Sequence, residues 1–101
     1  MNPRVKDVKP NPDYTLTIAF MNGEIKSFDV KPYLNTGIFK ELKDKSLFNS
    51  VKPFLGSIQW KSGQDFCPDT LYLESVIVTD AAILKNYASA VEHNFTDKIA
   101  V

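Results

Sequence analysis

The strongest constraint on the fold is a run of alternating side chains at residues 14–21, followed directly by Asn22-Gly23. Every second position in this run is large and apolar, and these positions are Tyr14, Leu16, Ile18 and Phe20. A period of two predicts a β-strand with one face in the core. Asn-Gly favours the positive φ angles of a type I′ turn, so residues 14–30 are predicted to form a β-hairpin.

The register of this hairpin depends on the length of its turn. A two-residue turn places Phe20 opposite Ile25 and sends Phe28 to the other face of the sheet. Phe28 is large and apolar, so we expect either a β-bulge near Lys26 or a second covered face.

Short elements are predicted on both sides of the hairpin. Residues 3–10 carry prolines and two valines and are predicted to add a strand beside it. Apolar residues at spacings of three and four over 36–51 predict two short helices joined near Asp44. Residues 54–66 predict two extended segments around a Ser62-Gly63 turn.

The last third of the chain is predicted to end in a helix. Pro68-Asp69 is typical of a first helical turn, and residues 75–79 hold a short β-branched run. A second, amphipathic helix is predicted from Thr79 or Asp80 onward. Its apolar stripe is Ile83, Leu84, Tyr87 and Val91. We expect this stripe to pack on the domain itself or on a second subunit.

Chain length and charge limit the number of domains and the classes of partner that the protein can have. A chain of 101 residues is near the commonest domain size, so one compact domain is expected. Twelve basic residues balance twelve acidic ones, which disfavours nucleic-acid binding. Residues 1–61 hold ten basic and six acidic side chains (net +4), and residues 62–101 hold two and six (net −4). This asymmetry suits an electrostatically matched partner or a homodimer.

The chain carries one cysteine, and no apolar run resembles a signal peptide or approaches the ~18 residues of a membrane span. A reducing cytoplasm is therefore the expected location.

Few residues in the sequence are candidates for catalysis or metal binding. A nucleophilic Cys67 would need a base, and the one histidine is His93, in the predicted last helix. One His and one Cys do not make a usual zinc site, and the glycines are isolated, so no metal or cofactor is expected. Asp65 and Asp69 could divide acid and base roles, but aspartates beside a turn more often cap backbone N–H groups.

Two aromatic residues bracket the Lys61-Ser62-Gly63 turn. Trp60 and Phe66 are candidate anchors for a binding partner, and the alternative is that Trp60 closes one end of the core. In both cases the indole N–H of Trp60 should find an acceptor.

Several motifs, in this order, resemble a family of small bacterial proteins known as domain of unknown function 2442. They are Asn22-Gly23-Glu24, Phe28-Asp29 leading to Pro32 and Leu34, Gly37 before Phe39 and Leu42, and Trp60 followed by Gly63, Asp65, Pro68-Asp69 and Leu71-Tyr72. The resemblance covers about residues 3–75. Lys61 departs from it, because proline often follows the tryptophan, and Cys67 occupies a variable position.

The resemblance implies a small two-layer α+β domain with an antiparallel sheet over residues 1–78, extended by the helical segment 79–101. Family members often lie beside a gene for another small protein and are described as candidate antitoxins. We therefore expect a non-enzymatic module that binds a cognate protein. The expected binding residues are Trp60, Asp65, Phe66, Asp69 and Tyr72. A small-ligand-binding or regulatory domain is the alternative.

Overall fold

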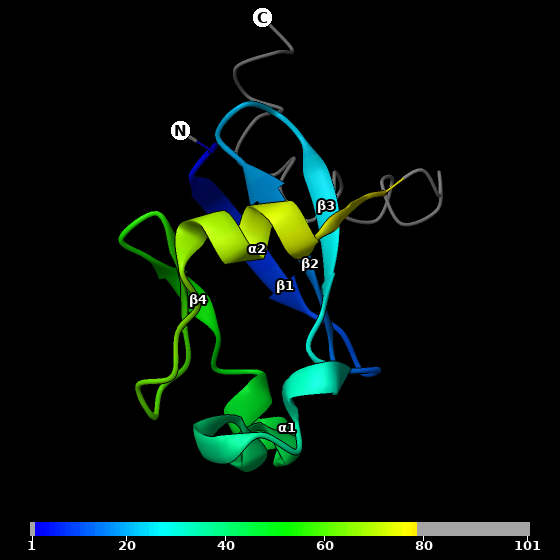
Figure 1. Cartoon of the computed structure of the whole chain (residues 1–101), viewed down its shortest axis with the longest axis vertical. Helices are drawn as coiled ribbons and strands as arrows, with labels where there is room; N and C mark the ends of the chain where they lie inside the picture. The colour runs from blue at the N-terminus through cyan, green and yellow to red at the C-terminus, as the bar shows by residue number, and fades with distance from the viewer. Residues whose placement is uncertain (1, 79–101) are drawn as a thin grey trace, which may run out of the picture.

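A four-stranded antiparallel sheet organises the domain, in the order β1-β2-β3-β6 (Figure 1). The computed structural model describes residues 2–78. The strands are β1 (Val5–Pro10), β2 (Thr15–Phe20), β3 (Ile25–Asp29) and β6 (Val76–Ile77). The predicted α+β class, the hairpin of β2 and β3, and the added strand β1 are all confirmed. The predicted helix at residues 79–94 lies outside the described residues.

The turn between β2 and β3 corrects the predicted register. Phe20 N–H donates to the Glu24 carbonyl (2.9 Å), and Gly23 N–H donates to the Phe20 carbonyl (2.9 Å). Three residues therefore form the turn, with Gly23 at φ +92°. This extra residue pairs Leu16 with Phe28, so Phe28 faces the core with no bulge near Lys26.

The same three-residue turn occurs twice more. Between β1 and β2, Tyr14 N–H donates to the Asn11 carbonyl (3.2 Å), and Tyr14 takes the left-handed position at φ +65°. After Trp60, Gly63 N–H donates to the Trp60 carbonyl (2.9 Å), and Gly63 has φ +100°. A non-glycine residue in this conformation costs about 1–2 kcal/mol. Tyr14 offsets this cost because its ring packs edge-on against Phe48, with the ring centroids 5.1 Å apart.

Short helices close one end of the sheet. They are the 3₁₀ helices η1 (Lys31–Tyr33) and η2 (Gly37–Lys43) and the single α-helical turn α1 (Lys45–Phe48). The two helices predicted over residues 36–51 are confirmed, and Asp44 joins them by accepting the Ser46 N–H (3.0 Å). Three residues per turn put Phe39 and Leu42 on the same side of η2, while Ile38 is exposed.

A second, two-stranded sheet follows. Strands β4 (Lys52–Phe54) and β5 (Ser57–Gln59) pair around the two-residue turn Leu55-Gly56. The sequence predicted extended segments around Ser62-Gly63 instead. That turn exists, and it closes an isolated bridge between Gln59 and Asp65, but the longer pairing lies before it. Leu-Gly was missed because leucine is not a usual turn residue.

Helix α2 (Pro68–Glu74) crosses one face of the four-stranded sheet (Figure 1). Pro68 occupies the first turn, where its missing N–H costs nothing, and Asp69 suits the positive end of the helix. The core lies between this helix, the sheet and the short helices. Its largest fully buried side chains are Trp60, Phe20, Phe28, Phe48, Leu16, Ile18, Leu42, Ile58, Leu71 and Val30.

Candidate functional site

Trp60 and Phe66, predicted as binding anchors, belong to the core. Trp60 is 1% exposed, and its indole N–H donates to the Phe48 carbonyl (3.0 Å). Phe66 is buried and lies 5.9 Å from Trp60, measured between ring centroids. Neither ring can contact a partner in this conformation, so their assignment as exposed anchors is wrong. The other reading, in which Trp60 closes the core and its N–H finds an acceptor, is the one observed.

The other three predicted binding residues lie in separate environments. Asp65 is exposed and pairs through its backbone with Gln59. Asp69 is exposed and accepts a hydrogen bond from the side-chain amide of Asn2 (3.0 Å). Tyr72 is half-buried on α2, edge-on to Phe20. The structure therefore does not bring the five predicted residues together into one exposed surface.

Tyr72 forms a polar cluster with two residues from the first hairpin. Lys26 is buried on the core face, its ammonium 3.7 Å from the centre of the Tyr72 ring, and it donates to the Tyr72 carbonyl (2.8 Å). A cation at this end of α2 also suits the negative end of the helix dipole. The Tyr72 hydroxyl donates to Glu24, which lowers the pKa of Glu24 and raises the pKa of Tyr72. This cluster ties α2 to the hairpin.

The lowered pKa of Glu24 gives a testable pH dependence. Its carboxylate is stabilised in the folded state, so the contribution is present above the unfolded pKa and is lost as pH falls through the folded one. We expect wild type to melt at a higher temperature than Glu24→Gln at neutral pH, with the gap closing below about pH 4. Melting curves across pH test this. In a Tyr72→Phe background, the difference in melting temperature between Glu24 and Glu24→Gln should largely disappear. A difference that does not change with pH would contradict the assignment.

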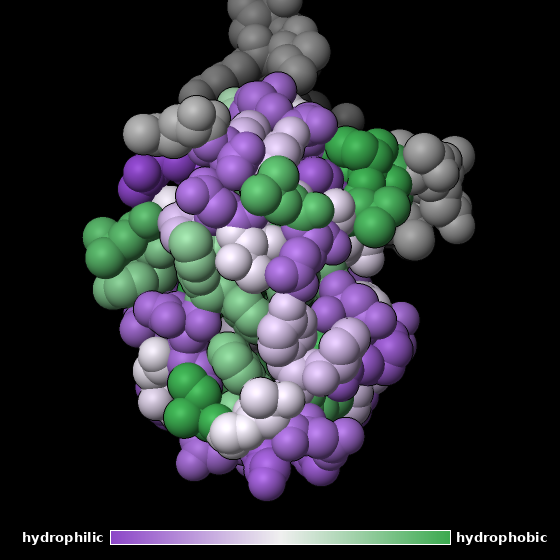
Figure 2. Space-filling view, in the orientation of Figure 1, coloured by the Kyte–Doolittle hydropathy of each residue, from purple (hydrophilic) through white to green (hydrophobic). Residues whose placement is uncertain are grey.

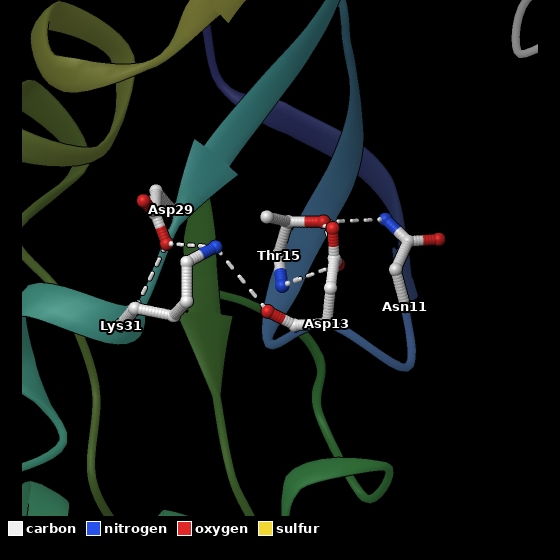
Figure 3. Close-up of polar contacts among 5 residues, drawn as sticks. All are labelled: Asn11, Asp13, Thr15, Asp29 and Lys31. Carbon is white, nitrogen blue, oxygen red and sulfur yellow. Dashed lines mark hydrogen bonds and ion pairs between the residues drawn. The ribbon is translucent and has the colours of Figure 1, made fainter.

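A second polar cluster surrounds the turn between β1 and β2 (Figure 3). The Asn11 amide donates to the hydroxyl of Thr15 (3.1 Å). The Thr15 hydroxyl in turn donates to Asp13 (2.6 Å), and this bond lowers the pKa of Asp13. The Lys31 ammonium pairs with Asp29 (3.1 Å) and also donates to the Asp13 carbonyl (3.3 Å). Sequence analysis missed this cluster, although Asn-Pro-Asp is a typical turn signal.

These bonds hold the turn in its three-residue conformation. A shallow pocket of about 320 Å³ lies beside the turn, lined by Asn11, Pro12, Asp13, Thr15, Thr17, Ser27 and Val78. The Asn11 amide donates to Thr17 (2.9 Å) as well as to Thr15, so both of its hydrogens are engaged. A polar ligand in this pocket would have to compete with those bonds.

The described residues bring together no group of three His, Cys, Asp or Glu side chains that could hold a metal ion. Cys67 is exposed at the start of α2, and His93 lies outside the described residues. No helix within residues 2–78 is long and apolar enough to cross a membrane.

The tip of the β4–β5 hairpin, which we call the arm, exposes apolar side chains. Leu55 is 76% exposed and Phe54 is 39% exposed. Figure 2 shows an apolar patch over this tip, at the left of the view. Other exposed apolar residues lie around α2 and β6, at Leu73, Val76 and Ile77, and singly at Met21 and Ile38.

The backbone singles out Leu55 among these residues. Leu55 has φ +49° and Gly56 has φ +84°, and positive values at both positions are typical of a type I′ turn. Asparagine tolerates this conformation, whereas leucine is strained by about 1–2 kcal/mol. Because the side chain is also exposed, burial in the core does not offset the strain. Strain of this kind is found at functional sites, where it points to a role outside the fold.

Basic residues flank the arm. Arg4 is exposed, and a side chain at Gly56 would lie 2.5 Å from its guanidinium carbon, so this cation rests against the turn. Lys52 is exposed at the start of β4. The arm therefore combines an apolar tip with positively charged edges, as in interfaces that have an apolar centre and a polar rim.

The fold and this surface define a small α+β domain with an exposed apolar hairpin tip. Residues 5–76 match the model of the family described as "Protein of unknown function (DUF2442)", and the chain belongs to that family. No curated protein and no solved structure matches the chain significantly.

Proposed function

We propose that this chain is a non-enzymatic protein-interaction module of the antitoxin type, which binds and masks a cognate protein in the cytoplasm. The observation that carries the proposal is Leu55, which is both strained and 76% exposed. The strained backbone of Leu55 raises the free energy of the free protein. Because its side chain is exposed, it is available to gain contacts on binding.

The chemistry of the arm defines the surface it would fit. Phe54 and Leu55 would enter an apolar pocket, and the neighbouring cations Arg4 and Lys52 favour acidic residues around that pocket. The binding surface proposed here thus replaces the one predicted around Trp60. Asp69 and Tyr72 are engaged within the domain, through Asn2 and Glu24.

Leu55→Asn separates binding from folding. Asparagine suits the left-handed conformation, so we expect the variant to unfold at the same or a higher temperature than wild type. The same change removes the apolar tip, so the Kd for the partner should rise at least about tenfold. The partner is first isolated by co-purification from the native cells, and Kd is then measured with both proteins pure.

Leu73→Asn is the matched control, because Leu73 is also exposed (69%) but lies on α2, away from the arm. It should change Kd less than about threefold. Equal affinities of wild type and Leu55→Asn would overturn the proposed surface. If the chain instead carries a small molecule in native mass spectra and no stoichiometric protein, the ligand-binding alternative replaces the protein-binding function.

A further inference from the structure

The four-stranded sheet has a second face, turned away from α2, which we call the outer face. Tyr72 of α2 packs on Phe20 and Lys26, which fixes the side on which α2 lies. The outer-face residues of the central strands are Thr15, Thr17 and Ala19 on β2, opposite Asp29, Ser27 and Ile25 on β3.

Part of the outer face is buried. Along β2 the expected alternation of buried and exposed positions is missing, because Thr17 (4% exposed) and Ala19 (8%) are buried as well as the core-facing residues. Ala19 does not belong to the main hydrophobic core cluster. An antiparallel strand that is buried on both sides has both faces covered. Asn11, whose amide donates to the Thr17 hydroxyl (2.9 Å), covers part of this face, and Ala19 is covered by something other than the main core.

The chain reaches this face at Val78. Val78 is 9% exposed, lies outside the main core cluster, and lines the shallow pocket together with Thr17 and Ser27. Its N–H donates to the carbonyl of Ile25 (3.0 Å). Val78 therefore brings the chain to the outer face, beside β3.

Twenty-three residues follow Val78 (101 − 78). Their sequence carries the apolar stripe Ile83, Leu84, Tyr87 and Val91, at the spacing of one helix face. A helix of about 14 residues is about 20 Å long, which matches the length of a six-residue strand. The small side chains of Thr17, Ala19 and Ser27 leave room for larger ones above them.

We propose that the outer face is the docking site of residues 79–101 of the same chain, with the apolar stripe packed over Thr17 and Ala19. The outer face is then not the surface that meets a partner, and the domain has a core on each side of its sheet. This inference does not depend on the protein-binding function.

Thiol accessibility in the full chain tests the proposal. In a Cys67→Ser background, a thiol introduced by Ala19→Cys should react at least about tenfold more slowly than one introduced by Lys9→Cys. Lys9 is exposed on β1 and pairs with Thr17, so it reports an open position on the same face. Thr17→Cys is the second buried probe, and melting curves show that each variant is folded.

Charged substitutions in the apolar stripe test whether this segment is what buries the outer face. Leu84→Asp with Tyr87→Asp should raise the Ala19→Cys rate to near that of Lys9→Cys, whereas Asn86→Asp, the matched control beside the stripe, should leave it slow. Fast reaction at Ala19→Cys and Thr17→Cys without those charges would overturn the proposal. Slow reaction at Ala19→Cys that persists with both Asp substitutions present would also overturn it. The proposal would equally fail if a dimer seen by analytical ultracentrifugation dissociated on dilution and the slow reaction became fast at the same time.

Discussion

Trp60→Ala should lower the free energy of unfolding by about 3–5 kcal/mol. The side chain is 1% exposed, and its removal leaves a cavity between Phe48 and Phe66. It also leaves the Phe48 carbonyl without its indole donor. For a domain of this size the melting temperature should fall by more than about 12 °C. Denaturant unfolding followed by circular dichroism gives the free energy directly.

Trp60→Phe is the companion variant, because it keeps most of the buried ring and loses the indole N–H. It should cost clearly less than Trp60→Ala. A Trp60→Ala protein as stable as wild type would show that the ring is not part of the core. Loss of partner binding in Trp60→Ala has to be interpreted with this result, since an unfolded module binds nothing.

Phe66→Ala should be similarly destabilising, by about 3–5 kcal/mol. The Phe66 ring lies at the centre of an aromatic cluster. Its ring neighbours, with centroid distances of 4.8 to 5.9 Å, are Phe39, Phe28, Tyr33 and Trp60. One truncation therefore weakens the contacts of η1, η2, β3 and the Trp60 turn together.

Phe54→Ala is the matched control for Phe66→Ala, because it removes the same atoms from the exposed arm. Its cost should stay below about 1 kcal/mol. The two unfolding free energies, measured in urea, separate core from surface. Equal losses at the two positions would mean that the arm packs against the domain and is not free to contact a partner.

Local patterns predicted the elements well. The alternation at Tyr14–Phe20 gave the central strand, and Pro68-Asp69 marked the start of α2. These signals depend on neighbouring residues only. The hairpin register was wrong because Asn-Gly fits both a two-residue and a three-residue turn, and the choice between them is made by burial of Phe28 against the rest of the domain.

The candidate site was harder to predict for the same reason. Sequence alone does not distinguish a tryptophan that closes a core from one that anchors a partner, and the acceptor at Phe48 lies twelve residues away. Lys26 is charged and reads as exposed, yet the register places it on the core face under α2. Leu55 became informative only when its φ angle was combined with its exposure.

The three-residue turn at Met21–Gly23 also determines how this sequence can change over time. Side chains in β3 alternate between core and outer face, so losing or gaining one turn residue would exchange Lys26 and Phe28 with Ile25 and Ser27. Substitutions at the exposed positions Met21 and Asn22 leave that count unchanged. Single-residue insertions and deletions should therefore be far rarer than substitutions at this turn among functional relatives.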